Sequence, residues 1–162
     1  MLPDAFNFSV EAALRGIEVP CFVAVFAVDG VEPGLYRWPD LDRPLRAGPL
    51  RDVVFRVCLN QELARDAAYH VITAIDLAAL DDERSYREAQ IAAGIVDGRL
   101  HLAAYALGIG ASGMTFIDSE IEDLLGEPLG SLLITCVGLP PARRRGARAG
   151  ERTTFAIPND RD

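Results

Sequence analysis

The stretch that decides the fold is residues 84–126, which read RSYREAQIAAGIVDGRLHLAAYALGIGASGMTFIDSEIEDLLG. Apolar residues, many of them alanine, recur through residues 86–107, so the pattern predicts one long helix that is buried around most of its girth. Gly108 and Gly110 are expected to end this helix as a C-cap. Asp118 is expected to cap a second, short helix. The apolar residues of that helix are at inward-facing spacing: Ile121, Leu124 and Leu125.

The glycines between the two predicted helices match a known pattern in the wrong context. Gly108, Gly110 and Gly113 form GIGASG, which fits the GxGxxG pattern of dinucleotide-binding domains. That phosphate-binding fingerprint needs a strand before the glycines and a helix after them. Here the glycines follow a helix, so we do not expect a doubly wound nucleotide fold. A flexible-backbone loop beside a buried helix is instead a place where a flat ligand could lie against main-chain amides.

Length and composition limit the class of protein. A chain of 162 residues is most simply one domain with a core of its own. Half of its residues are apolar, but no apolar run reaches the roughly 18 residues of a membrane span, and the N-terminus lacks the basic start of a signal peptide. We therefore expect a cytoplasmic protein whose surplus apolar residues form a subunit interface rather than contact a membrane. The net charge of -8 argues against nucleic acid as a partner.

The cysteines give no sign of a metal site. Cys21, Cys58 and Cys136 each lie inside an apolar run, without the spacing of metal ligands. We expect three reduced thiols in the core and no bound metal.

The rest of the chain predicts several strands and two more helices. Ser9 is expected to cap a short helix that stops at Gly16. Residues 19–28 and 35–38 are expected to form a hairpin, because turn dipeptides separate them. Residues 50–68 are interpreted as one helix with these core contacts: Val53, Val54, Val57 and Leu63. Further strands are expected at residues 69–75, 131–139 and 153–157.

This order of elements predicts an α+β domain over residues 1–162. Its sheet should be antiparallel or mixed, with helices packed over it and the long helix at its centre. Residues 141–162 are expected to form a basic linker and a C-terminal tail.

Two motifs in this order carry a family resemblance. The segment from YREAQIAAGIV to GMTFIDSEIEDLLG, followed by SLLITCVGLP, resembles the C-terminal half of nitroreductase-like flavoproteins. The phrase VEPGLYRWPD is similar to the hairpin of the SagB-type dehydrogenases, which oxidise azolines in peptide maturation. The resemblance covers residues 30–140.

The resemblance implies an FMN-dependent oxidoreductase built as an intertwined homodimer, with the flavin at the subunit interface and the long helix in the dimer core. A flavin transfers hydride equivalents itself, while the protein binds and orients it. Ser112, Gly113, Met114 and Thr115 would lie against the isoalloxazine ring, largely through backbone groups. Three arginines would meet the flavin phosphate, because a guanidinium pairs with phosphate through a planar fork of donors: Arg143, Arg144 and Arg145.

The sequence also departs from the family pattern. The arginine-rich N-terminal motif that grips FMN is not found, so we expect an N-terminally shortened domain. Leu80 and Asp81 stand where azoline-oxidising members carry Lys and Tyr, and Thr115 stands where they usually carry Gly. No catalytic residue can be named from the sequence. Asp81, Asp82 and Glu83 fit the first turn of the long helix, and His70 and His101 fit structural roles.

These departures leave a second hypothesis open. The chain could be a catalytically degenerate nitroreductase-like subunit with a structural or partner-recruiting role. If a partner subunit supplied the phosphate contacts, both hypotheses would hold at once: the chain would bind flavin and would also depend on its partner.

Overall fold

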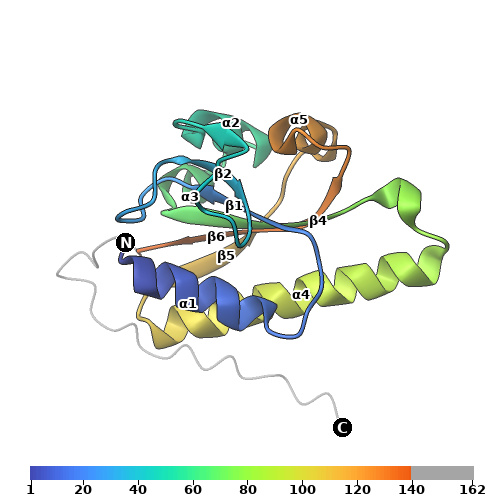
Figure 1. The fold of residues 1–162 in the computed structure, drawn as a ribbon, viewed down its shortest axis with the longest axis horizontal. Coiled ribbons are helices and arrows are strands. Elements are labelled where there is room, and N and C mark those ends of the chain that lie inside the picture. Colours follow the sequence, from blue (N-terminus) through green and yellow to red (C-terminus); the bar gives the residue numbers. More distant parts are fainter. Residues whose placement is uncertain (140–162) are drawn as a thin grey trace, which may run out of the picture.

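The computed structural model describes residues 1–139, in which six antiparallel strands form one sheet between two layers of helices (Figure 1). The strand order is β3-β2-β1-β4-β6-β5. The strands are β1 (Cys21–Val25), β2 (Gly34–Arg37), β3 (Arg46–Ala47), β4 (Tyr69–Ile75), β5 (Gly110–Met114) and β6 (Gly130–Gly138). This confirms the predicted α+β class and the hairpin of β1 and β2. The predicted strand 153–157 and the predicted linker 141–162 lie outside the described residues.

The helices divide between the two faces of the sheet. The α-helices are α1 (Pro3–Leu14), α2 (Arg51–Val57), α3 (Glu62–Asp66), α4 (Glu83–Ala106) and α5 (Ile121–Leu125). Two short 3-10 helices, η1 (Leu77–Ala79) and η2 (Asp118–Glu120), precede α4 and α5. Helices α1 and α4 cover one face of the sheet, and α2, α3 and α5 cover the other (Figure 1).

Alternation along the strands explains the two cores. Successive side chains of a strand point to opposite faces. In β1, Phe22 and Ala24 pack with α2, α3 and α5, whereas Val23 and Val25 pack with α1 and α4. A central strand buried on both faces reads as a continuous apolar run, which is why residues 19–28 were recognisable as a strand from the sequence.

The long helix forms as predicted, but it is less buried than predicted. Helix α4 buries one stripe of residues against the sheet and α1, namely Ala93, Val96, Leu100, Ala103 and Ala104. Its other apolar residues are exposed in the single chain: Ile91 by 63%, Leu102 by 72% and Tyr105 by 87%. The prediction of a helix buried around most of its girth is therefore wrong for one chain alone. An apolar pattern does not say whether the chain's own core or another surface covers a given side.

The predicted glycine loop is mostly a strand. Gly108 ends α4 with a positive φ of 70°, as predicted. Gly110, however, begins β5, which pairs antiparallel with β6 along the edge of the sheet. GASGM contains no β-branched or aromatic residue, so its propensity gave no strand signal. The pairing with β6 decides its conformation.

Residues 50–68 form two helices instead of one. Leu59 and Asn60 both adopt positive φ, of 56° and 55°, and break the segment between α2 and α3. Val53, Val54 and Val57 pack in the core as predicted, but Leu63 is 59% exposed.

The predicted capping residues are wrong in two places. Ser9 lies in the middle of α1, where its hydroxyl is buried and 2.5 Å from the Tyr69 hydroxyl. Asp118 is the first residue of η2 rather than a side-chain cap. Ile121, Leu124 and Leu125 are buried as predicted. All three cysteines are buried and unpaired, which confirms their predicted place in the core.

Candidate functional site

Edge strand β5 carries most of the predicted flavin-contacting segment, and its outer side exposes backbone groups. The Val137 carbonyl of β6 accepts a hydrogen bond from the Ala68 amide (2.8 Å), so it points toward β4 and away from β5. Ala111 lies opposite Val137, and Gly113 lies opposite Thr135, two residues along. In an antiparallel ladder these are non-hydrogen-bonded pairs, so the N–H and C=O groups of Ala111 and Gly113 face outward. The main-chain groups that could lie against a flat ligand are therefore those of an open sheet edge, rather than those of a flexible loop.

A cavity of about 390 Å³ lies beside this edge. We call it the α3–β5 pocket. Its apolar walls are Leu63 from α3, Ala67 just after α3, Ala111 from β5 and Leu139 after β6. Its lining also includes Ser112 and Cys136. This volume falls within the range of small-molecule sites in proteins.

Two glycines shape the lining of the pocket. A Cβ atom at Gly138 would come within 3.2 Å of the Ala68 nitrogen and 3.3 Å of the Ala67 Cα atom, so a larger residue would push the end of α3 away from β6. Gly110 leaves its part of the lining bare, because a Cβ atom there would meet only the Gly138 oxygen, at 3.7 Å. Gly138 therefore permits a close approach of the Ala67–Ala68 backbone to β6.

The charges of the described lining are acidic. Glu62 and Asp66 belong to the lining, and no lysine or arginine of residues 1–139 joins them there. Arg65 lies nearby, but it pairs with Glu62 at 2.7 Å and stacks on the Phe55 ring at 4.7 Å. The described lining suits an uncharged flat group and contains no cation to meet a phosphate.

Cys136 lines the pocket from β6, opposite Ser112. Burial raises the pKa of the Cys136 thiol, although a hydrogen bond from the Ser112 backbone lowers it in part. The thiol therefore stays protonated near neutral pH and presents a weakly polar surface.

His70 lies behind the pocket, on the neighbouring strand β4. It pairs in register with Cys136, and its Nε2 atom is 2.8 Å from the Ala64 carbonyl oxygen. Its Nδ1 atom is buried with no hydrogen-bond partner among the described residues. Burial lowers the pKa of His70 to about 4, so its imidazole is neutral at physiological pH.

The structure separates the four residues that were predicted to contact the ring. Ser112 lines the pocket, whereas Met114 is buried in the core and Gly113 lies beside Asp97 of α4. The Thr115 carbonyl accepts a hydrogen bond from the Gln61 side chain (2.9 Å), which fixes the backbone after β5. Arg143, Arg144 and Arg145 lie outside the described residues.

Sequence reasoning missed the α3 side of the pocket. Leu63 and Ala67 gave only a helical apolar signal, and nothing in the sequence distinguishes a pocket wall from a core contact. Cys136 was recognised only as a core thiol.

The carboxylates before α4 lie at the start of this helix, as the sequence predicts. Asp82 caps the helix by accepting a hydrogen bond from the Ser85 amide (2.7 Å), and this bond lowers the pKa of Asp82. Asp81 is exposed before the cap, and Leu80 is half-buried. His101 Nδ1 is 2.9 Å from the Asp97 carbonyl oxygen one turn earlier, a local helix contact.

Residues 1–139 contain neither a cluster of metal ligands nor a helix suited to a membrane. No group of three or more His, Cys, Asp and Glu side chains there is placed to hold a metal ion. In the same part of the chain, no helix is both long and apolar enough to span a bilayer.

One face of α4 stands out as an unpartnered apolar surface. Its members are spaced four, seven and three residues apart, that is by one or two helical turns, which places them in one stripe: Ile91, Ile95, Leu102 and Tyr105. Gly94 and Gly98 lie in the same stretch, and a Cβ atom at either would meet nothing within 4 Å. The N-terminal part of α4 extends beyond the sheet (Figure 1). We call this stripe the α4 apolar face.

Comparison with solved structures identifies the fold. A protein from Anabaena variabilis ATCC 29413 assigned as a nitroreductase matches 86% of this chain with a TM-score of 0.78 and 29% identity. The chain has a nitroreductase-like fold. It spans only 34% of the length of that Anabaena protein.

Two further structures share the fold at lower identity. A protein from Desulfovibrio desulfuricans assigned as a nitroreductase, solved in complex with FMN, matches 93% of this chain and 80% of its own length, with a TM-score of 0.59 and 20% identity. The E. coli microcin synthetase McbBCD complex with truncated pro-MccB17 bound contains a chain that matches 85% of this chain and 64% of its own length, with a TM-score of 0.68 and 13% identity. No family model and no curated protein matches the chain.

Proposed function

We propose that the chain is an FMN-binding oxidoreductase subunit whose flavin ring lies in the α3–β5 pocket, along the open edge of β5. The observation that carries this proposal is the combination of a bare, apolar pocket with outward-facing backbone groups beside it. The isoalloxazine ring is flat and carries hydrogen-bonding atoms at its edge. Leu63 and Ala67 would contact its face, and the backbone of Ala111 and Gly113 would bind its edge. The flavin, when bound, supplies the hydride chemistry.

The phosphate of FMN needs cations that the described lining does not provide. Two carboxylates in that lining, Glu62 and Asp66, would repel a phosphate placed close to them. We assign the phosphate contacts to Arg143, Arg144 and Arg145, which follow β6 in the sequence, or to a second subunit. Arginine is suited to this role through its planar fork of donors.

A second copy of the chain is the proposed cover of the α4 apolar face. Burying a large apolar side chain such as Leu102 or Tyr105 contributes about 1.5–3 kcal/mol relative to leaving it exposed. The bare surface at Gly94 and Gly98 would let two α4 helices approach closely. This agrees with the homodimer that the resemblance implies, and one structural neighbour is itself part of a multi-subunit complex.

The substrate side of the reaction is less suited to azoline oxidation. Leu80 cannot act as a base, and exposed Asp81 lacks the hydroxyl group and the reach of a tyrosine. We therefore favour an electron-poor acceptor that takes hydride directly from the flavin over an azoline that must also lose a proton.

The second candidate function is a catalytically degenerate subunit of the same fold. The acidic lining and the residues at positions 80 and 81 favour it. Such a subunit would keep the sheet and the α4 apolar face, bind no flavin, and recruit a partner.

FMN titration of the full chain separates the two candidates. We expect quenching of flavin fluorescence on binding, and a loss of affinity of about tenfold or more in Ser112→Leu, because the larger side chain fills the pocket. Ser119→Leu is the matched control, since Ser119 is exposed on η2 outside the lining. Thr115→Gly should raise affinity if the threonine side chain crowds the ring.

Three outcomes decide between the candidates. Loss of affinity in Ser112→Leu alone supports the flavin pocket. Equal affinity in Ser112→Leu and Ser119→Leu would place the flavin elsewhere. A chain that stays colourless in excess FMN would support the degenerate subunit.

A further inference from the structure

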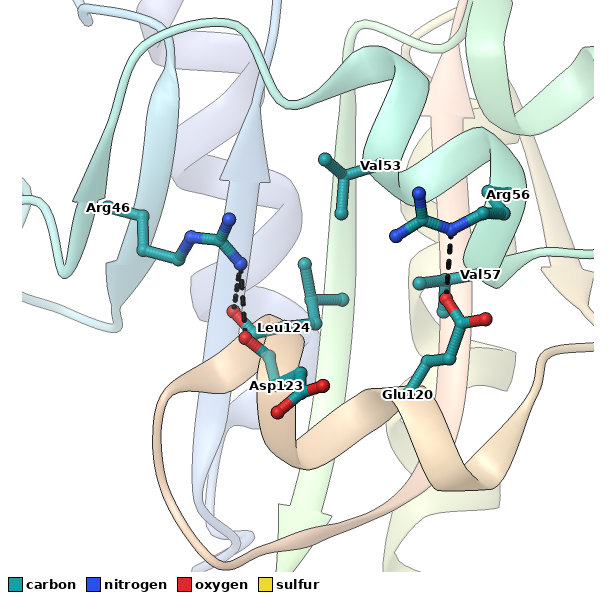
Figure 2. Close-up of a pocket in the computed structure, with 7 residues that line it drawn as sticks. All are labelled: Arg46, Val53, Arg56, Val57, Glu120, Asp123 and Leu124. Carbon is teal, nitrogen blue, oxygen red and sulfur yellow. Dashed lines mark hydrogen bonds and ion pairs between the residues drawn. The ribbon is translucent and has the colours of Figure 1, made fainter.

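A second cavity, of about 390 Å³, opens between β3, α2 and the η2–α5 segment (Figure 2). We call it the α2–α5 cleft. Its lining residues are Arg46, Val53, Arg56, Val57, Glu120, Asp123 and Leu124. None of them lines the α3–β5 pocket, so the cleft is a separate site.

Arg46 enters the cleft from β3 and is held by the end of α5. Its Nη1 atom donates to the carbonyl oxygens of Asp123 (3.1 Å) and Leu124 (3.2 Å). Gly34 on the adjacent strand β2 makes this placement possible, because a Cβ atom there would be 2.8 Å from the Arg46 carbonyl oxygen. Among the described residues, no carboxylate forms an ion pair with Arg46, so its positive charge is available to a ligand.

Arg56 enters the cleft from α2, on the opposite side (Figure 2). Its Nε atom lies 3.1 Å from a carboxylate oxygen of Glu120, and its side chain is 63% exposed. Its two terminal nitrogens make no hydrogen bond within residues 1–139. A planar guanidinium held at one edge keeps its other N–H groups aimed at whatever occupies the space beside it.

An apolar surface lies between the two guanidinium groups. It consists of Val53 and Val57 of α2 and Leu124 of α5 (Figure 2). A ligand that fits has an apolar body to cover this surface and an anionic group to meet the arginines.

The two carboxylates in the lining favour a ligand whose anionic group carries a single negative charge. Glu120 and Asp123 bring two negative charges to the same cleft, equal in number to the two arginines. A nucleotide or another polyanion would be attracted by Arg46 and Arg56, but it would also be repelled by these two carboxylates. A monoanion can lie between the arginines and keep its distance from Asp123.

We propose that the α2–α5 cleft binds a small organic monocarboxylate. The carboxylate group accepts hydrogen bonds from the guanidinium groups of Arg46 and Arg56. The aliphatic part of the ligand packs on Val53, Val57 and Leu124.

A ligand in the cleft should also change the environment of the backbone that follows β5. The Ile117 amide donates to the Val57 carbonyl (2.8 Å), which joins the end of α2 to the segment before η2. Ile117 is therefore a reporter inside the fold that does not itself line the cleft.

Titration of the full chain with hexanoate, followed by amide chemical shifts, tests the proposal. We expect saturable shifts at Glu120 and Ile117 for one molecule per chain. Hexan-1-ol tests the apolar part alone, and inorganic phosphate tests the charge alone. Both should bind about tenfold more weakly or not at all, because each lacks one of the two contacts.

Three variants assign the binding to the cleft. Arg56→Gln should weaken hexanoate binding by about tenfold, and Arg56→Lys should restore part of it, since the charge returns without the planar fork. Arg43→Gln is the matched control, because Arg43 is an exposed arginine outside the lining. Arg56 is itself exposed, so its replacement should leave the fold intact, as checked by circular dichroism.

Several results would overturn the proposal. These are the absence of saturable shifts, equal binding of hexan-1-ol or phosphate, and unchanged hexanoate affinity in Arg56→Gln. Because no arm uses FMN, a failure of the flavin proposal would leave this test unaffected.

Discussion

His70 has its imidazole fully buried between β4 and α3, where its protonation opposes folding. Burial lowers its pKa from 6.5 to about 4. The unfolded chain therefore binds more protons than the folded chain between these two pH values, so stability falls as the pH drops through this window. The shift corresponds to about 3 kcal/mol lost from the free energy of unfolding between pH 7 and pH 4.

Replacing His70 with glutamine tests this effect. Glutamine can still donate a hydrogen bond to the Ala64 carbonyl but does not titrate. Urea unfolding at a series of pH values should show wild type and His70→Gln losing stability differently, with the gap changing only below about pH 6.5. A constant gap down to pH 4 would contradict the buried, neutral imidazole.

Single residues also show the limit of prediction for the site. Ser112 was predicted and lines the pocket, while its neighbour Gly113 was predicted and lies on the opposite face of the sheet, beside Asp97 of α4. The alternation of a strand separates neighbours that a loop would have kept together. Since GASGM gave no strand signal, this separation could not be inferred from the sequence.

The elements that were predicted correctly share a strong local pattern. Strand β6 is a long, mostly apolar run, and α4 has helical spacing with a glycine at its end. Strand β4 alternates only weakly, but four of its seven residues are β-branched. The α2–α3 break was missed because Leu59 and Asn60 are not strong turn formers as a pair, yet both adopt positive φ. Tertiary contacts, such as the Gln61 side chain on the Thr115 carbonyl, fix that turn.

Helices α1 and α4 are held together by Arg99 of α4. Its Nη1 atom donates to the carbonyl oxygens of Ala13 (3.3 Å) and Arg15 (2.7 Å) at the end of α1. A cation at a helix C-terminus also interacts favourably with the helix dipole. We expect Arg99→Met to reduce the free energy of unfolding by about 1–2 kcal/mol, measured by urea denaturation.

Arg87→Met is the matched control for this element. Arg87 lies on the same helix, but it is 67% exposed and only pairs with Glu83 at 3.6 Å. Its loss should cost less than about 0.5 kcal/mol. Equal costs for the two variants would refute the role of Arg99 as the link between α1 and α4.

For the whole molecule, the α4 apolar face predicts self-association. Leu102→Glu places a charge within the proposed interface, so the dimer should dissociate in size-exclusion chromatography with light scattering. Leu45→Glu is the matched control, because Leu45 is exposed on the segment before β3. It should leave the dimer intact. A wild-type chain that elutes as a monomer at all concentrations would contradict this interface.

The sequence predicts an apolar helix, but it does not say whether a second copy of the chain covers that helix. The apolar stripe of α4 satisfies the pattern of a buried helix equally well whether the chain or a second copy covers it. The structure resolves which residues the single chain buries, and it leaves Leu102 and Tyr105 exposed.

The most direct test of the account is analytical ultracentrifugation of the full chain with equimolar FMN, recorded at the visible flavin band and at the protein band. The account predicts that flavin absorbance sediments with the protein as one boundary at the mass of two chains. Flavin absorbance that stays evenly distributed along the cell while the protein sediments would contradict it.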